Sequence, residues 1–328
     1  MDLEREKGKI ILENRTPEEE LAYRRYLRKR IRMRKRRRQV MIARTIVALV
    51  GVILVFFIFY GIGKMTGPIK GDSGKKADAT EEPKVTPLVV DVPNGYQGVY
   101  DKLYGMREEN PEINDILINL GKYPVELLTL LSNNTETLSF VSDYLMHVDD
   151  EEKSGGITGE ELTGSIPLFQ QWDKRWGYLK YGSNIIAING CGPTCMSMVY
   201  TGLTGNTDKD PAVIADFCLE NNYYTEDSGT AWSLMLNGAK KLGLDAEKIS
   251  IGKESIKEKL DSGQPVICSM KPGDFTDTGH FIVLCGITED GKLMLNDPNN
   301  ISRSEKKWDM DTVLSQIKAA WSYSYTIQ

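Results

Sequence analysis

The sequence predicts an α+β fold for the C-terminal half of the chain, preceded by one transmembrane helix and a small helical module. Two patterns predict this order: apolar residues recur at helical spacing up to about Gly263, and apolar runs of strand length follow it. Helices followed by strands favour a helical layer packed on an antiparallel sheet. We therefore divide the 328 residues into a basic segment (1–40), a transmembrane helix (41–63), a flexible linker (64–94), the helical module (95–150) and the α+β domain (160–328).

The transmembrane helix is predicted from an uncharged stretch, Thr45–Gly63, which is rich in Val, Ile, Leu and Phe. As a helix, its 19 residues cover about 28 Å, close to the roughly 30 Å hydrocarbon core of a bilayer. A run of arginines and lysines, Arg24–Arg38, precedes it and by the positive-inside rule stays in the cytoplasm. We therefore expect a single-pass membrane protein with a cytoplasmic N-terminus and an extracytoplasmic C-terminal domain.

Charge separates the two ends of the chain. Residues 1–64 contain 17 basic and 7 acidic residues, and the whole chain carries a net charge of −5, so the remainder carries −15. An acidic ectodomain argues against nucleic acid as a partner and favours cationic or neutral peptides. Clustered arginines also bind nucleic acid in other proteins, but beside a membrane span they have a sufficient role in fixing topology and contacting anionic lipids.

The helical module is predicted from three groups of apolar residues at helical spacing, which begin at Ile113, Val125 and Leu138. The linker before the module is rich in Gly, Lys, Asp, Thr and Pro, which is typical of a flexible tether. Two interpretations of the module stay open. It is either a small packing unit or a lid or prodomain over the active site.

Capping residues and apolar runs predict the elements of the α+β domain. Asp210-Pro211 starts one helix, Thr230 caps another that carries Trp232, and a third is expected near Asp311–Ala319. The predicted strands are Val266–Met270, His280–Thr288, Lys292–Asp297 and Ser322–Ile327.

Cys191 is the first candidate for chemistry, because it lies on a glycine-flanked turn at a predicted helix start, Gly190–Cys195. The first N–H groups of a helix lack intrahelical partners, and their partial positive charge favours a thiolate. Pro193 suits the first helical turn, where its missing N–H costs nothing. The sequence therefore predicts a reactive thiol at Cys191.

A histidine and an aspartate are predicted to lie side by side. His280 opens an apolar run, and an Asp290-Gly291 turn reverses the chain so that Asp297 ends the neighbouring strand. An aspartate in that place can orient the imidazole of a catalytic base. Upstream, the amide of Gln171 is a candidate to hold an oxyanion together with the Cys191 N–H, with its neighbour Gln170 as the competing assignment. Together these are the parts of a thiol hydrolase.

The motifs of the C-terminal half, about Ile166 to Gln328, resemble those of the family 39-like cysteine peptidases, whose best-known members are the bacteriocin-processing, double-glycine leader peptidases. The resemblance implies a bacterial enzyme with a papain-like fold, in which a cleft lies between two layers. It also implies Cys191 as nucleophile, His280 as general base and then acid, Asp297 as the residue that orients His280, and Gln171 as oxyanion donor. The matching residues are Phe169, Gln171, Asp173, Arg175 and Trp176, then Gly190–Thr194, Gly229–Trp232, Gly263–Ile267, Gly279–Phe281 and Asn296–Pro298.

Each candidate also has an ordinary structural interpretation. Cys191 is equally consistent with a small buried residue at a helix cap, His280 with a core histidine, and Asp297 with a turn former. Taken jointly they favour the hydrolase, because the only histidine of the domain falls on a strand beside the strand that bears the aspartate. Another histidine, His147, lies in the helical module and is assigned no role.

The other four cysteines, Cys195, Cys218, Cys268 and Cys285, lie in apolar runs and are interpreted as packing residues. A Cys268–Cys285 disulfide is conceivable on neighbouring strands but is not favoured. The chain has no CxxC pair, no HExxH motif and no cluster of His and Cys. We therefore expect neither a metal nor a cofactor.

The preferred hypothesis is a membrane-anchored, extracytoplasmic cysteine peptidase that hydrolyses peptide or amide bonds in a peptide or protein substrate at the bacterial cell membrane. One alternative is a cell-wall amidase or endopeptidase, because cell-wall peptides are the nearest substrates. A second alternative is a non-catalytic domain that binds peptides at the cell surface, which would not require Cys191, His280 and Asp297 together.

Overall fold

A computed structural model describes residues 90–162, 165–226 and 229–326, all within one compact unit, Val85–Gln328. The predicted basic segment, the transmembrane helix and most of the linker lie outside the described residues. Among the helices of the described residues, none is both long and apolar enough to cross a membrane.

The helical module contains four α-helices, and the last three begin where apolar spacing predicted them. α3 was not predicted, since its apolar positions are spread among polar ones. The module core is formed by leucine, isoleucine and aromatic side chains that are almost completely buried. The helices are α3 (Gln97–Met106), α4 (Ile113–Ile118), α5 (Val125–Asn133) and α6 (Leu138–Asp143), joined by single 3-10 turns η1 (Leu120–Lys122), η2 (Thr135–Thr137) and η3 (Tyr144–Met146).

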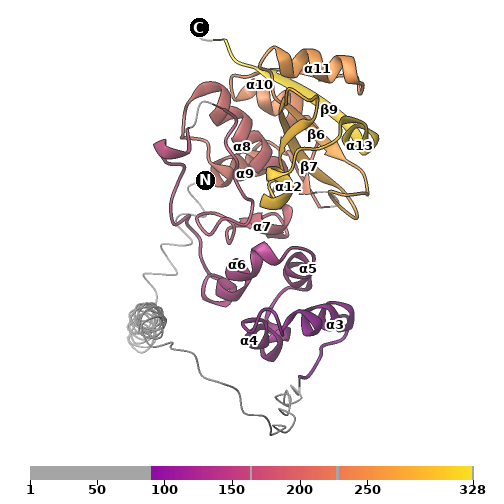
Figure 1. The fold of residues 1–328 in the computed structure, drawn as a ribbon. Helices are drawn as coiled ribbons and strands as arrows, with labels where there is room; N and C mark the ends of the chain where they lie inside the picture. Colours follow the sequence, from indigo (N-terminus) through magenta and orange to yellow (C-terminus); the bar gives the residue numbers. More distant parts are fainter. Residues whose placement is uncertain (1–89, 163–164, 227–228, 327–328) are drawn as a thin grey trace, which may run out of the picture. The chain divides into compact units, whose positions relative to one another are not determined.

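The module lies beside the α+β domain (Figure 1), and its apolar core continues into that domain. Tyr178, Ile185 and Ala187 of that domain are buried in the same apolar cluster as the module helices. The Tyr178 ring stacks on Phe140 with centroids 4.1 Å apart, and its hydroxyl donates to the Phe140 carbonyl at 3.0 Å. These contacts favour the interpretation of the module as a packing unit.

The helices of the α+β domain follow the predicted order, with one correction. Asp210 caps α9 as predicted, because its carboxylate accepts the N–H groups of Ala212 and Val213. Thr230 does not cap a helix: it lies in a short strand, its hydroxyl is hydrogen-bonded to Tyr181, and the next helical turn begins only at Leu234. The helices are η4 (Gly159–Glu161), α7 (Ile186–Asn189), α8 (Cys191–Thr204), α9 (Pro211–Glu220), the π-helical turn η5 (Leu234–Gly238), α10 (Ala239–Lys241), α11 (Lys253–Asp261), α12 (Ile301–Glu305) and α13 (Met310–Ser315).

Five antiparallel strands form the main sheet in the order β5-β9-β6-β7-β8. The predictions for β6, β7 and β8 are confirmed, whereas β5 was missed because it is a polar edge strand with no buried position. The predicted helix near Asp311–Ala319 is too long, since α13 ends at Ser315 and β9 begins at Ile317. The strands are β5 (Asp245–Ile249), β6 (Val266–Met270), β7 (His280–Ile287), β8 (Leu293–Asn296) and β9 (Ile317–Ser324), with two small antiparallel pairs, β1 (Lys180–Tyr181) with β2 (Asn184–Ile185) and β3 (Tyr224–Thr225) with β4 (Gly229–Thr230).

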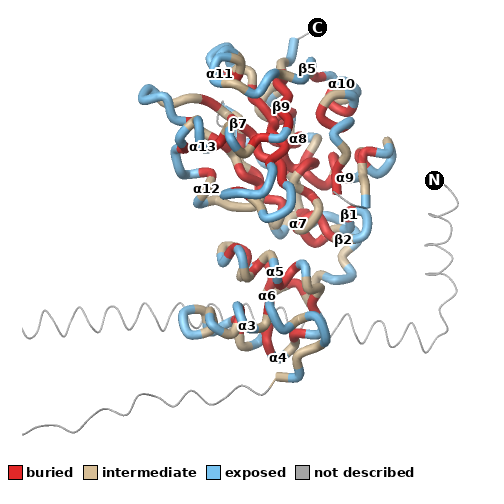
Figure 2. The backbone as a smooth tube through the Cα atoms, turned by 90° about the vertical axis from the view of Figure 1, so that its right-hand side faces the viewer, coloured by how far each residue is buried: buried red, intermediate tan, exposed pale blue. Residues whose placement is uncertain are grey.

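Helices cover both faces of the sheet, so the structure adds a second helical layer to the one expected. Ile267 and Val283 face the α8 side and share a core with Val199 of α8. Val266 faces the opposite side and packs with Ile256 of α11. The most deeply buried backbone accordingly runs through the central strands and α8 (Figure 2).

Candidate active site

Cys191 is the first residue of α8, directly after the short helix α7. Gly190 makes the junction between these helices: its N–H donates to the Ile186 carbonyl at 2.8 Å, and a Cβ there would lie 2.4 Å from that oxygen. The thiol is half-buried and lines a cavity. The prediction of a cysteine at a helix start is therefore confirmed.

Gly192 lets the opposite wall of the cavity approach Cys191. A Cβ on Gly192 would lie 2.6 Å from the Thr230 Cγ2 atom, so a larger residue would displace that wall. Thr230 is held in place by the Tyr181 hydroxyl, 3.0 Å from its own. The two glycines around Cys191 thus serve close packing rather than flexibility.

His280 and Asp297 form a buried pair at one end of the β7–β8 hairpin. His280 is the first residue of β7, and Asp297 follows the last residue of β8, which pairs with Val283 of β7. The His280 Nε2 atom lies 2.7 Å from Asp297 Oδ1, and the two side chains are 8% and 0% exposed. The predicted juxtaposition of these residues is therefore confirmed.

The Asp297 carboxylate is fixed by donors other than His280. The Asn299 N–H donates to Oδ1 at 2.8 Å, and Arg303 donates to Oδ2 at 3.2 Å. The Asp297 N–H in turn donates to the Ser304 hydroxyl at 2.9 Å. A carboxylate held on several sides keeps one orientation toward the imidazole.

The environment of His280 and Asp297 shifts both pKa values so that the two side chains are ionised. Burial lowers the pKa of His280, but the charge and hydrogen bond of Asp297 and the hydrogen bond of Cys191 outweigh it and raise the pKa to about 10. Burial raises the pKa of Asp297, but His280, the Asn299 N–H and Arg303 together hold it below its ordinary value. At neutral pH the pair is therefore an imidazolium and a carboxylate.

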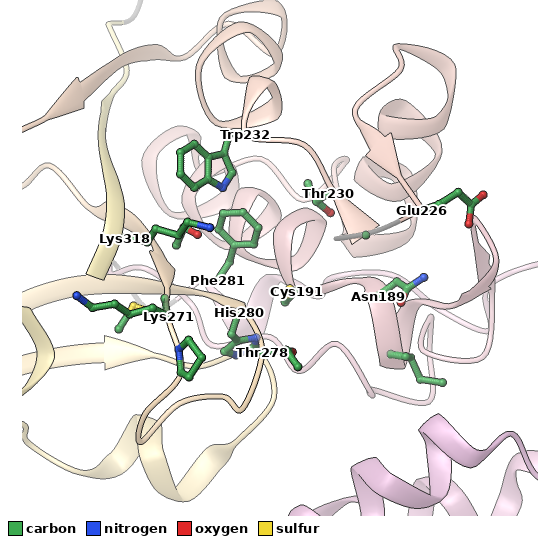
Figure 3. Close-up of a pocket in the computed structure, with 16 residues that line it drawn as sticks. Asn189, Cys191, Glu226, Thr230, Trp232, Lys271, Thr278, His280, Phe281 and Lys318 are labelled. Carbon is green, nitrogen blue, oxygen red and sulfur yellow. The ribbon is translucent and has the colours of Figure 1, made fainter. Parts of the chain in front are cut away.

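Cys191 and His280 line the same cavity, and their side chains point toward one another (Figure 3). Since Nε2 of His280 is engaged by Asp297, the other ring nitrogen, Nδ1, is the one available to the thiol. A cysteine at a helix start beside a histidine that an aspartate orients is the arrangement of a catalytic thiol. The structure thus brings Cys191, His280 and Asp297 together.

Gln171 is placed differently from the prediction. Its amide nitrogen donates to the carbonyls of Ala187 at 2.7 Å and Ile188 at 3.4 Å, and the residue is not part of the cavity lining. Gln170 is also buried, and its amide lies 3.5 Å from the Asp297 carbonyl. In this geometry Gln171 supports the turn ahead of Cys191, because both of its donors are directed to backbone carbonyls there.

The cavity has a volume of about 640 Å³ and extends on both sides of Cys191 and His280. Six further polar residues line it and were not predicted as site residues: Asn189, Glu226, Ser269, Lys271, Thr278 and Lys318. The signal for Asn189 was its place two residues before Cys191, and the signal for Lys271 was its place directly after a predicted strand. Lys318 was hidden because it was assigned to the over-long helix. The helical module contributes no residue to the lining as the structure describes it.

The other cysteines are free thiols in apolar surroundings, including Cys268 and Cys285. Burial raises the pKa of Cys218 and of Cys285 to about 12 and that of Cys195 well above its ordinary value. Their thiols therefore stay protonated at neutral pH. Within the described ranges, no three or more His, Cys, Asp or Glu side chains are grouped so as to hold a metal ion.

Comparison with known proteins agrees with this geometry. A family model described as the Peptidase C39 like family matches residues 163–327. The chain belongs to this family. The resemblance to family 39-like cysteine peptidases is thereby confirmed, and the chain is a cysteine peptidase.

Individual proteins are more distant. No curated protein matches the chain. A solved structure of a double glycine motif protease from an AMS/PCAT transporter, in complex with the leader peptide, is 15% identical to this C39-like peptidase, with a TM-score of 0.32. The match covers 54% of this chain and 96% of that chain.

Proposed function

We propose that Cys191, His280 and Asp297 form the catalytic triad of a membrane-anchored peptidase that hydrolyses peptide or amide bonds outside the cytoplasm. One observation carries this proposal. The His280 Nε2 atom is hydrogen-bonded to Asp297 Oδ1 at 2.7 Å, and His280 lines a cavity together with Cys191. A nucleophile, a base and an orienting carboxylate in this sequence are the parts that covalent hydrolysis needs.

The chemistry proceeds in two halves. The Cys191 thiolate attacks the carbonyl carbon of the scissile bond, and the resulting tetrahedral intermediate collapses as the His280 imidazolium gives its proton to the leaving amine. A thioester to Cys191 remains. His280, now neutral, takes a proton from water as it attacks the thioester, and the carboxylic acid leaves while the thiolate is restored. Asp297 keeps the imidazole oriented and offsets its positive charge.

The oxyanion is stabilised by N–H groups at the start of α8, where the Cys191 N–H lacks an intrahelical acceptor. A direct contribution from Gln171 requires its amide to leave the Ala187 and Ile188 carbonyls. Gln171→Ala tests that contribution, since removal of an oxyanion donor lowers kcat by about 100- to 1000-fold. A much smaller loss of kcat would mean that Gln171 only supports the turn ahead of Cys191.

Residues outside the described part of the chain support the location. The stretch Thr45–Gly63 is long enough to span a bilayer, and Arg24–Arg38 precedes it. We therefore propose a bacterial cell-membrane protein whose peptidase domain is extracytoplasmic. Protease added to intact cells should digest an epitope at the C-terminus and spare one at the N-terminus, and the reverse pattern would overturn the topology.

The triad is tested with the full chain in detergent and an iodoacetamide probe. Cys191 should be the labelled cysteine at neutral pH, and His280→Ala should slow labelling, because it removes the neighbouring imidazolium. Hydrolysis of a mixed peptide library should disappear in Cys191→Ala. Labelling spread evenly over all five cysteines, or full hydrolysis by Cys191→Ala, would contradict the proposed mechanism.

A further inference from the structure

The two sides of the cleft differ in charge. Trp232, Lys271 and Lys318 lie on one side of Cys191 and His280, and Glu226 lies on the other (Figure 3). The cleft is therefore polarised along its length, with a cationic and aromatic wall at one end and a carboxylate at the other.

Trp232 forms the centre of the cationic wall. The residue is 40% exposed, which is unusual for so large an apolar side chain, and its ring is held edge-on against Trp321 with centroids 5.5 Å apart. The ammonium groups of Lys318 and Lys248 lie 5.4 Å and 6.0 Å from the Trp232 ring centroid. A cation near an aromatic face is attracted to it, so the ring draws both ammonium groups toward Trp232, and of the two lysines Lys318 lines the cleft.

The lysines of this wall differ from others in the same domain. Lys253, Lys257, Lys259 and Lys292 are each paired with a carboxylate at 2.7 to 2.9 Å. Among the described residues, no ion pair engages Lys271 or Lys318 of the wall, or Lys248 beside its Trp232 ring. The carboxylate of Asp274, in the loop after Lys271, accepts a hydrogen bond from the Gln316 amide at 2.7 Å and forms no ion pair with the lysines of the wall. The ammonium groups of the wall are therefore not held in ion pairs by the described residues.

We infer that this wall binds a carboxylate of the substrate, so that the enzyme prefers peptides with an acidic group on the Trp232 side of the scissile bond. The inference rests on the proposed peptidase function and names its substrate class. It also replaces the expectation drawn from net charge, which favoured cationic or neutral peptides, because the potential inside a cleft is set by the residues that line it and not by the distant surface.

The test compares peptides that differ at one position, with Glu, Gln or Lys placed in turn on each side of the cleaved bond and with free or amidated C-termini. The full chain should cleave the Glu peptide with a kcat/KM about fivefold above that of the Gln peptide at low salt, on one side only. A preference lost on amidation identifies the C-terminal carboxylate as the group bound, and one that survives amidation identifies a side chain.

Variants decide which residues carry the preference. Lys318→Glu should reverse it in favour of Lys peptides, Lys318→Arg should keep it, and the control Lys257→Glu on α11, on the other face of the sheet, should leave it unchanged. Equal cleavage of the Glu, Gln and Lys peptides, or a preference that Lys318→Glu does not alter, would overturn the inference while leaving the peptidase function intact.

Binding separates this inference from the proposed function. Dissociation constants of the same peptides for Cys191→Ala, measured by fluorescence anisotropy, should follow the same order. Selective binding of acidic peptides without hydrolysis by the intact chain would reject the catalytic proposal and retain the acidic ligand class. Absence of binding to every peptide would reject the ligand class.

An independent observation concerns the segment that follows Asp297, which is held by the helical module. Glu136 accepts hydrogen bonds from the backbone N–H groups of Ile301 at 2.7 Å and Ser302 at 2.9 Å, and from the Ser302 hydroxyl. Asn134 donates from its side-chain amide to the Asn299 carbonyl. Burial raises the pKa of Glu136, but these hydrogen bonds outweigh it and lower the pKa, so the carboxylate is ionised when it binds the segment.

The same segment fixes the orienting carboxylate of the site. Asn299, whose carbonyl Asn134 binds, donates its N–H to Asp297 at 2.8 Å. Arg303 lies in α12, whose first two N–H groups are bound by Glu136, and its guanidinium donates to Asp297 at 3.2 Å. Two short connections therefore lead from the module to Asp297. The residues at their start lie outside the family match, which begins at residue 163.

We propose that Glu136 and Asn134 are positioning residues for Asp297, acting through the segment 298–303. Glu136→Ala should lower kcat by about 10- to 100-fold with little change in KM, since a small misplacement of a catalytic group is costly. Glu136→Asp should restore part of kcat. Glu126→Ala, an exposed acid on α5 of the same module, serves as the matched control.

The pH profile distinguishes positioning from a merely structural role. Because Asp297 raises the pKa of His280, displacement of its carboxylate should move the alkaline limb of the kcat profile down by about one unit. A Glu136→Ala enzyme with a lower melting temperature but an unmoved alkaline limb and normal kcat at permissive temperature would overturn the proposal.

Discussion

The helical module and the α+β domain share one buried core but use burial differently. In the module, the buried residues are almost all apolar, and Asn134 and Thr137 are the buried polar residues among those described. In the α+β domain, the ion pair of His280 and Asp297 is buried at one end of the β7–β8 hairpin. The domain therefore carries the cost of burying charged groups, while the module contributes apolar packing and the hydrogen bonds from Glu136 to the segment that follows Asp297.

The largest expected effect is a loss of peptide hydrolysis without a loss of stability. Cys191→Ala should abolish peptide hydrolysis, because no other cysteine lines the cavity with His280 in the described structure. The melting temperature should stay within a few degrees of the parent, since the thiol is only half-buried. Circular dichroism melts and a peptide assay on the same preparation measure both. Hydrolysis by Cys191→Ala at the parental rate would mean that another residue is the nucleophile.

The next effect tests the module as a source of stability. Phe140→Ala should lower the free energy of unfolding by about 3–5 kcal/mol, because it leaves a cavity against the stacked ring of Tyr178. Urea denaturation gives the value. Ile118→Ala, at a position that is 61% exposed, is the matched control and should change it by less than about 0.5 kcal/mol. Similar losses in both variants would mean that the shared core adds nothing specific.

The third effect concerns pH and falls in the α+β domain. The folded-state pKa of His280, about 10, lies above its ordinary value of 6.5, so its contribution to stability is present below pH 6.5 and is lost as the pH rises toward 10. The pKa of Asp297 is lowered, so its contribution is present above its ordinary value of 3.8 and is lost at lower pH. Urea midpoints should therefore fall between pH 7 and 10 in the parent and less steeply in His280→Gln. If the urea midpoints of the parent and of His280→Gln fall equally steeply with pH, the pair does not control stability between pH 7 and 10.

The smallest effect concerns the rim between the two regions. Lys174 pairs with Asp143 at 2.9 Å, with both side chains more than a third exposed. Asp143→Asn should cost about 0.2–1 kcal/mol at low salt and less at high salt, because exposed ion pairs are screened. Urea titrations at two salt concentrations measure the difference. A loss of several kcal/mol would mean that this exposed pair, rather than the apolar core, joins the regions.

Sequence patterns predicted the elements that are determined by interactions between residues close together in the sequence. The start of α8 at Cys191, the β7–β8 hairpin and its terminal pair His280 and Asp297 follow from capping, turn chemistry and strand alternation within about 20 residues. Apolar spacing also gave α4, α5 and α6.

Long-range contacts and polar edges were not predictable in the same way. β5 has exposed polar residues at most positions, so it carries no strand alternation. The bonds from Glu136 to Ile301 and Ser302 join residues 165 and 166 positions apart, and no local pattern reports them. The hydrogen bonds of the Gln171 amide were not predicted for the same reason, because its acceptors depend on how α7 packs.

The shared core has a practical consequence for isolating the enzyme. A fragment cut at the start of the family match, residue 163, would expose the faces of Tyr178, Ile185 and Ala187 that the module now covers. Such a fragment would carry an open apolar surface and tend to aggregate. The smallest soluble unit therefore starts ahead of α3, near residue 90, and sequence similarity alone would place that boundary more than 70 residues too late.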